Sequence, residues 1–176
     1  MARAKAQRSL KSRALQLLAQ RDQSRLELKR KLLRHGRRDT AADSSEDVPW
    51  ADGESEVEVL LDWLEANRFL SNDRFVDSRV HAREARFGNL RIRNELAQHG
   101  VALPVERGRA LDGTELARAA AVRERRFGSL PCDAAERAAQ SRFLAGRGFS
   151  PDVIHRLMRQ LRDRSSAPGT DRQPAD

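Results

Sequence analysis

The sequence predicts an all-α protein: an elongated, curved array of three tandem three-helix repeats. Three observations support this prediction. Apolar residues follow helical spacing, as in Val57, Leu60, Leu61 and Leu64, and no stretch shows the sustained alternation of a β-strand. Capping residues and glycines divide the chain into short helices. Finally, a segment that ends in glycine occurs three times.

The repetition becomes visible when three glycines are aligned. With Gly36, Gly100 and Gly148 in register, a leucine stands four residues before each of them: Leu32, Leu96 and Leu144. The aligned segments read SRLELKRKLLRHG, NLRIRNELAQHG and AQSRFLAGRG. The glycine spacings are 64 and 48 residues, and an acidic insertion after the first copy accounts for the difference. One such unit buries too little apolar surface alone, so neighbouring units are expected to share a core.

The first repeat is expected at 8–67, after a disordered basic N-terminus at 1–7. Its helices are predicted near 9–20, 24–35 and 55–67. Ser24 with Glu27 has the spacing of a helix cap followed by a carboxylate that reaches back to the open N–H groups. The acidic insertion occupies 37–54, within a stretch from 39 to 62 that holds nine Asp or Glu and no base.

The second repeat is expected at 68–113, with helices near 72–87, 90–99 and 104–111. The third is expected at 114–163, with helices near 114–127, 134–146 and 151–163, followed by a disordered tail at 164–176. Asp133 with Glu136, and Ser150 before Pro151, mark two helix starts. Helix ends are predicted at glycines that follow apolar patterns: Gly36, Gly88, Gly100, Gly113, Gly128 and Gly148.

Composition argues against a membrane protein and against an enzyme. No window approaches the roughly 18 apolar residues of a membrane span, and a single cysteine, Cys132, excludes an internal disulfide, so we expect a cytoplasmic protein. The four histidines lack metal-ligand spacing with one another or with Cys132, and no glycine-rich phosphate loop is present. We therefore predict no catalytic residues, no metal and no cofactor.

The basic residues suggest an anionic partner. The net charge is +8, and residues 1–38 alone hold thirteen Lys or Arg against two acids. Bases that recur on equivalent turns of stacked repeats would form a long basic surface, although each could also serve only to solvate its helix. The candidates for this surface are Arg25, Lys29, Arg30, Arg86, Arg91, Arg93, Arg142 and Arg147.

A helix-turn-helix transcriptional regulator is the alternative interpretation. Short helices joined by tight turns build such proteins, and Asn89, Arg91 and Arg93 stand where a recognition helix would begin. No dimerisation element accompanies them, and we expect a monomer. This interpretation therefore ranks second.

Three segments resemble the RecX family, the bacterial regulators of RecA: ALQLLAQRDQSRLELKRKLLRHG, VEVLLDWLEANRFLSNDRFVDSRVHAREARFGNLRIRNELAQHGV and RAAQSRFLAGRGFSPDVIHRLM. The similarity runs in order from about residue 13 to residue 161. Its most specific part is the pattern of Ser24, Leu28, Lys31, Leu32 and Gly36, followed by Leu70, Asp73, Arg74 and Phe75.

The resemblance implies tandem three-helix repeats and a protein without enzymatic activity. It further implies binding in the groove of the RecA–DNA filament, with inhibition of RecA's ATP hydrolysis, strand exchange and co-protease functions. Recombination and the SOS response would thereby be restrained. Nucleic acid on its own would be bound weakly and without sequence preference.

Overall fold

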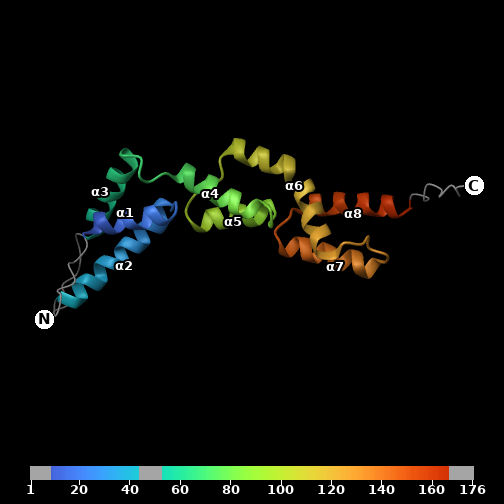
Figure 1. Ribbon diagram of the computed structural model, residues 1–176, viewed down its shortest axis with the longest axis horizontal. Helices are drawn as coiled ribbons and strands as arrows, with labels where there is room; N and C mark the ends of the chain where they lie inside the picture. Colours follow the sequence, from blue (N-terminus) through green and yellow to red (C-terminus); the bar gives the residue numbers. More distant parts are fainter. Residues whose placement is uncertain (1–8, 44–52, 167–176) are drawn as a thin grey trace, which may run out of the picture. The chain divides into compact units, whose positions relative to one another are not determined.

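The structure, a computed structural model, describes residues 9–43 and 53–166. These residues form eight α-helices and no strand (Figure 1), which confirms the predicted all-α class. The helices are α1 (Leu10–Gln20), α2 (Arg25–Asp43), α3 (Gly53–Ala66), α4 (Asn72–Glu84), α5 (Asn89–Gln98), α6 (Val105–Phe127), α7 (Ala134–Gly146) and α8 (Pro151–Ser166). The expected disordered segment 1–7, residues 44–52 of the acidic insertion and residues 167–176 of the tail lie outside the described residues. Among the described residues, no helix combines the length and the apolar character that a bilayer span requires.

The chain divides into two compact units. Unit 1 comprises Met1–Arg79 with Leu96–Ala102, and unit 2 comprises Val80–Glu95 with Leu103–Asp176. The helices α4 and α5 each contribute residues to both units. The division into three repeats stays a prediction.

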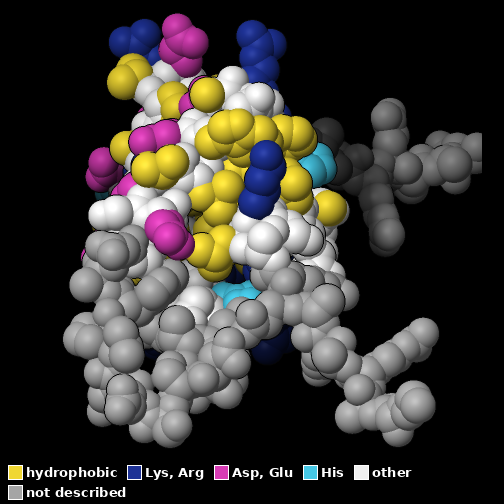
Figure 2. All heavy atoms as spheres, turned by 90° about the vertical axis from the view of Figure 1, so that its left-hand side faces the viewer, with side chains coloured by type: hydrophobic (Ala, Val, Ile, Leu, Met, Phe, Trp, Pro, Cys, Tyr) yellow, Lys and Arg dark blue, Asp and Glu magenta, His cyan; other side chains and the backbone are white. Residues whose placement is uncertain are grey.

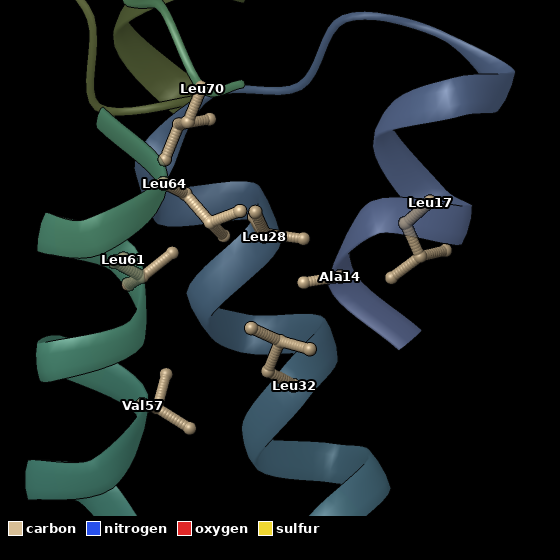
Figure 3. Close-up of a cluster of buried hydrophobic side chains, with 8 residues drawn as sticks. All are labelled: Ala14, Leu17, Leu28, Leu32, Val57, Leu61, Leu64 and Leu70. Carbon is tan, nitrogen blue, oxygen red and sulfur yellow. The ribbon is translucent and has the colours of Figure 1, made fainter. Parts of the chain in front are cut away.

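The core of unit 1 lies between α1, α2 and α3 (Figure 3). Side chains at helical spacing on α3 point toward those of α2 and α1, and full burial of each leucine contributes about 1.5–3 kcal/mol. The buried cluster is Ala14, Leu17, Leu28, Leu32, Val57, Leu61, Leu64 and Leu70.

The core of unit 2 lies between α6, α7 and α8. The apolar stripe of α8 packs against one face of α6 and the end of α7. The buried cluster is Ala119, Val122, Leu144, Phe149, Val153, Ile154, Leu157 and Leu161. Leu32, Leu96 and Leu144, which the aligned segments share, are each fully buried.

Two of the predicted helix caps are present. The Ser24 hydroxyl accepts a hydrogen bond from the Glu27 N–H at 3.1 Å, and the Asp133 carboxylate accepts one from the Glu136 N–H at 2.7 Å. α8 begins at Pro151, as predicted from Ser150, and the Ser150 hydroxyl donates to a buried carboxylate of α6, Glu115 Oε2, at 3.1 Å. The start of α8 is thereby tied to α6.

The ends of α5 and α7 share one backbone geometry. In each, the N–H of a left-handed glycine bonds a carbonyl three residues back, and the next N–H bonds one five residues back, which is the Schellman arrangement. Gly100 has φ +70° and Gly148 has φ +80°. These ends were predicted from the aligned glycines. The end of α3 follows the same pattern with Arg68, a non-glycine residue at φ +61°.

Three other glycines do not end helices as predicted. α2 continues through Gly36 to Asp43, and α6 passes through Gly113, joining the helices expected at 104–111 and 114–127. A glycine inside a helix costs only about 1 kcal/mol relative to alanine, so burial of Leu111 and Ala119 on either side of Gly113 outweighs it. α4 ends at Glu84, before Gly88, and α8 runs to Ser166, three residues into the expected tail.

Candidate anion-binding surface

Two of the predicted basic residues are neutralised within unit 1. Arg25 and Lys29 lie one turn apart on α2, opposite an acidic stripe of α3. Their nitrogens lie 2.5–2.7 Å from the carboxylates of that stripe, called here the α3 carboxylates: Glu54, Glu58, Asp62 and Glu65. On the face of unit 1 shown in Figure 2, acidic side chains lie beside hydrophobic and basic ones.

These contacts shift the protonation equilibria toward the charged forms. A hydrogen bond to Glu54, with a second to Glu58, raises the pKa of Lys29. The pKa of Glu58 lies below its usual value, mainly through its hydrogen bond with Lys29. Burial opposes the charge of Arg25, but hydrogen bonds with Glu58 and Asp62 outweigh burial and raise its pKa. The charges of Arg25 and Lys29 are therefore satisfied inside the unit.

Three further candidates are Arg30, Arg93 and Arg142. Arg93 pairs with Asp112 at 3.2 Å. Arg30 on α2 and Arg142 on α7 are exposed, and neither has an ion pair among the described residues. Arg30 belongs to unit 1, whereas the remaining candidates belong to unit 2. Among the described residues, Arg142 makes no ring contact of the kind that joins those candidates.

Arg86, Arg91 and Arg147 lie together around the ring of Phe87. Their guanidinium carbons are 5.7, 4.4 and 5.6 Å from the ring centroid. Arg147 also lies 5.0 Å from the centroid of Phe143. Cation–π contacts of this kind are worth about 0.5–1 kcal/mol each when exposed. Arg147 thus shares one site in unit 2 with Arg86 and Arg91, although more than 50 residues separate it from them in the sequence.

Two glycines allow this convergence. The N–H of Gly88 donates to the carbonyl of Arg147 at 3.0 Å, and the N–H of Leu90 donates to the carbonyl of Gly148 at 3.1 Å. A Cβ at Gly88 would lie 2.2 Å from the backbone nitrogen of Phe149. A Cβ at Gly148 would lie 2.4 Å from the Cβ of Arg91. Only glycine permits the two loops to approach this closely.

A buried carboxylate of α6 fixes the same junction. Glu115 is 4% exposed and accepts hydrogen bonds from the N–H groups of Asn89 at 2.9 Å and Ser150 at 3.2 Å. It therefore stands at the N-termini of both α5 and α8, where a negative charge is favourable. Sequence analysis did not identify this residue, because a single glutamate within a helix carries no recognisable pattern.

Two arginines of α6 have structural roles that the sequence did not reveal. Arg118 donates to the carbonyls of Glu84 and Phe87, at 3.2 and 2.9 Å, and its burial lowers its pKa. Arg123 is buried and donates to Gln140 at 2.9 Å and to the carbonyl of Ser129. These two side chains hold loops in place and are not available to a partner.

Two other arginines of α6 complete the site. Arg125 and Arg126 line an open pocket of about 250 Å³ together with Arg86, Arg147, Val122 and Phe143. We call the five residues Arg86, Arg91, Arg125, Arg126 and Arg147 the arginine cluster. The run RERRF at 123–127 was the available signal for the two missed members.

The arginine cluster is not neutralised by the protein. In the part of the chain that the structure describes, none of its five members contacts a carboxylate. Guanidinium groups that converge without counter-charge repel one another, and they bind oxyanions through charge-assisted, often bidentate hydrogen bonds. The arrangement is suited to binding an anion.

Metal-ligand clusters and the Cys132 thiol are the reactive groups that the sequence raised. No three His, Cys, Asp or Glu side chains there could share a metal ion. A hydrogen bond with Glu136 raises the pKa of the exposed Cys132 thiol, which disfavours the nucleophilic thiolate.

Comparison with known proteins places the chain in a family. A family model described as the third three-helix domain of RecX matches residues 114–158. Regulatory protein RecX of Ralstonia nicotianae is 45% identical over 152 residues, which are 85% of this chain and 86% of that protein. The chain belongs to the RecX family. A more distant RecX, from Neisseria meningitidis serogroup A, is 30% identical over 160 residues, 90% of this chain and 95% of that protein.

A solved RecX structure shares the fold. The crystal structure of RecX from Lactobacillus salivarius superimposes with a TM-score of 0.61 and 17% sequence identity, covering 87% of this chain and 94% of that one. The match to the third RecX domain includes three of the five members of the arginine cluster: Arg125, Arg126 and Arg147. Most of the arginine cluster therefore lies in a recognised RecX domain.

Proposed function

We propose that this RecX-family chain is a non-enzymatic regulator that binds RecA and the RecA–DNA filament. Inhibition of RecA's ATP hydrolysis, strand exchange and co-protease activity would restrain recombination and the SOS response. Support comes from the family membership, because the relatives are named regulatory proteins, and from the resemblance in the segments quoted above. The protein would act in the cytoplasm as a monomer, without cofactor or metal.

The observation that carries this proposal is the un-neutralised arginine cluster of unit 2. A filament of protein and DNA presents phosphates and carboxylates, to which exposed arginines are attracted. Arg86, Arg91 and Arg147 are the candidates from the sequence that are best placed for this role. Three other candidates are paired with carboxylates of their own units: Arg25, Lys29 and Arg93. We therefore propose that they contribute less to filament binding.

The helix-turn-helix alternative is disfavoured by the start of α5. Asn89 is 3% exposed, its amide donates to Asp112 at 2.7 Å, and its side-chain oxygen accepts from Arg118. An asparagine held in this way cannot contact a base edge. Arg93, the third residue of the supposed reading surface, is paired with Asp112.

The direct test is ATP hydrolysis by RecA on single-stranded DNA. We expect the chain to slow hydrolysis when it is present in amounts close to those of RecA, because it would occupy the filament. Unchanged hydrolysis, together with protection of a defined duplex site, would instead support the transcriptional regulator.

Two neighbouring arginines provide a matched pair for the same assay. Arg91→Ala removes an exposed, unpaired charge, so filament binding should weaken and its dependence on salt should flatten. Arg93→Ala removes a charge that is paired with Asp112, and it should have the smaller effect. Equal effects of the two substitutions would contradict a contact specific to the arginine cluster.

A further inference from the structure

We propose that the open pocket lined by four members of the arginine cluster binds single-stranded DNA; these members are Arg86, Arg125, Arg126 and Arg147. One phosphate would lie between the guanidinium groups of Arg86 and Arg126, and an adjacent base would lie against Phe143 and the Arg147 side chain. The choice of DNA over RNA rests on the proposed function, whereas the choice of a single nucleic acid strand rests on the pocket itself.

The charge of the pocket indicates a phosphate. Four of its six lining residues are arginines: Arg86 follows α4, Arg125 and Arg126 lie on α6, and Arg147 follows α7. Arg125 is anchored to the carbonyls of Ala121 and Ala85, which holds one wall in place. Arg86 and Arg126 are exposed, and each lies beside a phenylalanine ring, at 5.7 and 5.6 Å. Their guanidinium groups remain available to an oxyanion.

The apolar wall of the pocket indicates a base. Val122 and Phe143 line the same space as the arginines, and Phe143 packs edge-on against Phe127 with centroids 5.3 Å apart. A protein carboxylate would use the guanidinium groups alone and leave this wall empty. A nucleotide uses both, because bases stack on aromatic rings and on guanidinium planes while the backbone follows positive charge.

A single strand suits the pocket better than a duplex. Bases in a duplex are stacked and paired, so their faces cannot reach the wall formed by Phe143, whereas an unpaired base can be turned outward. The volume of about 250 Å³ lies just below the usual range for drug-sized ligands.

The test measures DNA binding by the full chain without RecA. Fluorescence anisotropy of labelled oligodeoxythymidine would compare the wild type with the double variant Arg86→Gln and Arg126→Gln. We expect the dissociation constant to rise about tenfold or more, through loss of two charge-assisted contacts. A plot of the logarithm of the dissociation constant against the logarithm of the salt concentration should have a slope that is smaller by roughly one. Unchanged affinity would overturn the proposal.

A matched double variant controls for net charge. Arg156 and Arg159 of α8 are exposed, lie in the same unit and have no ion pair among the described residues. Arg156→Gln with Arg159→Gln removes the same charge, and we expect less than about a twofold change in affinity. An equal loss of DNA affinity in the two double variants would show that general surface charge, and not the pocket, accounts for binding. Circular dichroism would show that both variants keep their helices.

Two further probes test the nature of the ligand. An abasic strand of equal length keeps the phosphates and lacks the bases, so it should bind more weakly than oligodeoxythymidine. Equal binding would overturn the base contact, and stronger binding of poly-glutamate than of DNA would identify a protein partner instead. RecA is absent from these assays, so failure here is distinguishable from failure to slow RecA's ATP hydrolysis.

Discussion

The facing bases of α2 in unit 1 and the arginine cluster of unit 2 carry their charges in opposite settings. In unit 1, Arg25 and Lys29 face the α3 carboxylates at 2.5–2.7 Å, and the charges cancel within the fold. In unit 2, the arginine cluster surrounds Phe87 and an open pocket without a carboxylate among the described contacts. The number of bases on a helix therefore says little about its affinity for anions. What the neighbouring helix presents decides whether the charge is available.

The largest expected effect concerns the loop contact that assembles the arginine cluster. Gly148→Ala should lower the free energy of unfolding by roughly 3 kcal/mol or more, because φ is +80° and the new Cβ would overlap the backbone of Arg91. Urea unfolding followed by circular dichroism measures this change.

Gly113→Ala is the matched control for that substitution. Gly113 lies inside α6, and a Cβ there would meet nothing within 4 Å. Alanine should therefore stabilise the helix by up to about 1 kcal/mol. A similar loss of stability in both variants would contradict the role assigned to the loop contact.

Much of the fold could be predicted because its signals are local. The cap at Ser24 depends on two residues three positions apart, and the aligned leucines at 32, 96 and 144 mark one buried position each. The prediction was wrong at Gly36 and Gly113, where the local preference of glycine is weaker than the packing of the surrounding helix. A local rule cannot weigh contacts that form only in three dimensions.

The candidate site was predicted less completely for the same reason. The sequence places Arg25, Arg86 and Arg91 alike on polar helix faces. Only the approach of α3 to α2 distinguishes the neutralised Arg25 from the others. The acidic residues at 54, 58, 62 and 65 do follow a helical spacing that matches the bases at 25 and 29. That pattern could have predicted the pairing of α3 with α2. No sequence pattern predicts that Arg126 and Arg86 line the same pocket.

A smaller effect should appear when unit 1 is acidified. Burial opposes the ionisation of Glu27, but hydrogen bonds from Lys31 and Arg21 outweigh it and hold its pKa below the usual value. A carboxylate of this kind stabilises the fold above its unfolded pKa of about 4.3, and the stabilisation is lost as the pH falls through the lower, folded value.

Glu27→Gln should therefore lower the free energy of unfolding by about 1 kcal/mol at neutral pH. The difference from the wild type should vanish in acid. Tryptophan fluorescence during urea unfolding suits this measurement, since both tryptophans of the sequence fall within Met1–Arg79. A difference that stays constant from neutral pH to strong acid would contradict the ion-pair explanation.

The smallest effect tests the comparison between the units directly. If the α3 carboxylates alone prevent unit 1 from binding anions, then Glu58→Gln with Asp62→Asn should partly release both bases. Arg25 would keep only Glu65, and Lys29 would keep only Glu54. Affinity for single-stranded DNA should then rise about threefold, with a steeper dependence on salt, because exposed ion pairs are individually weak. Anisotropy at several salt concentrations measures both quantities.

The control removes the same two negative charges from unpaired positions of unit 1. Glu56 and Asp73 are exposed and contact no base among the described residues. Glu56→Gln with Asp73→Asn changes the net charge equally but releases no arginine, so we expect the affinity to rise less. If both double variants bind DNA equally well, total charge governs the affinity, and the pairing of Arg25 with α3 is irrelevant to binding.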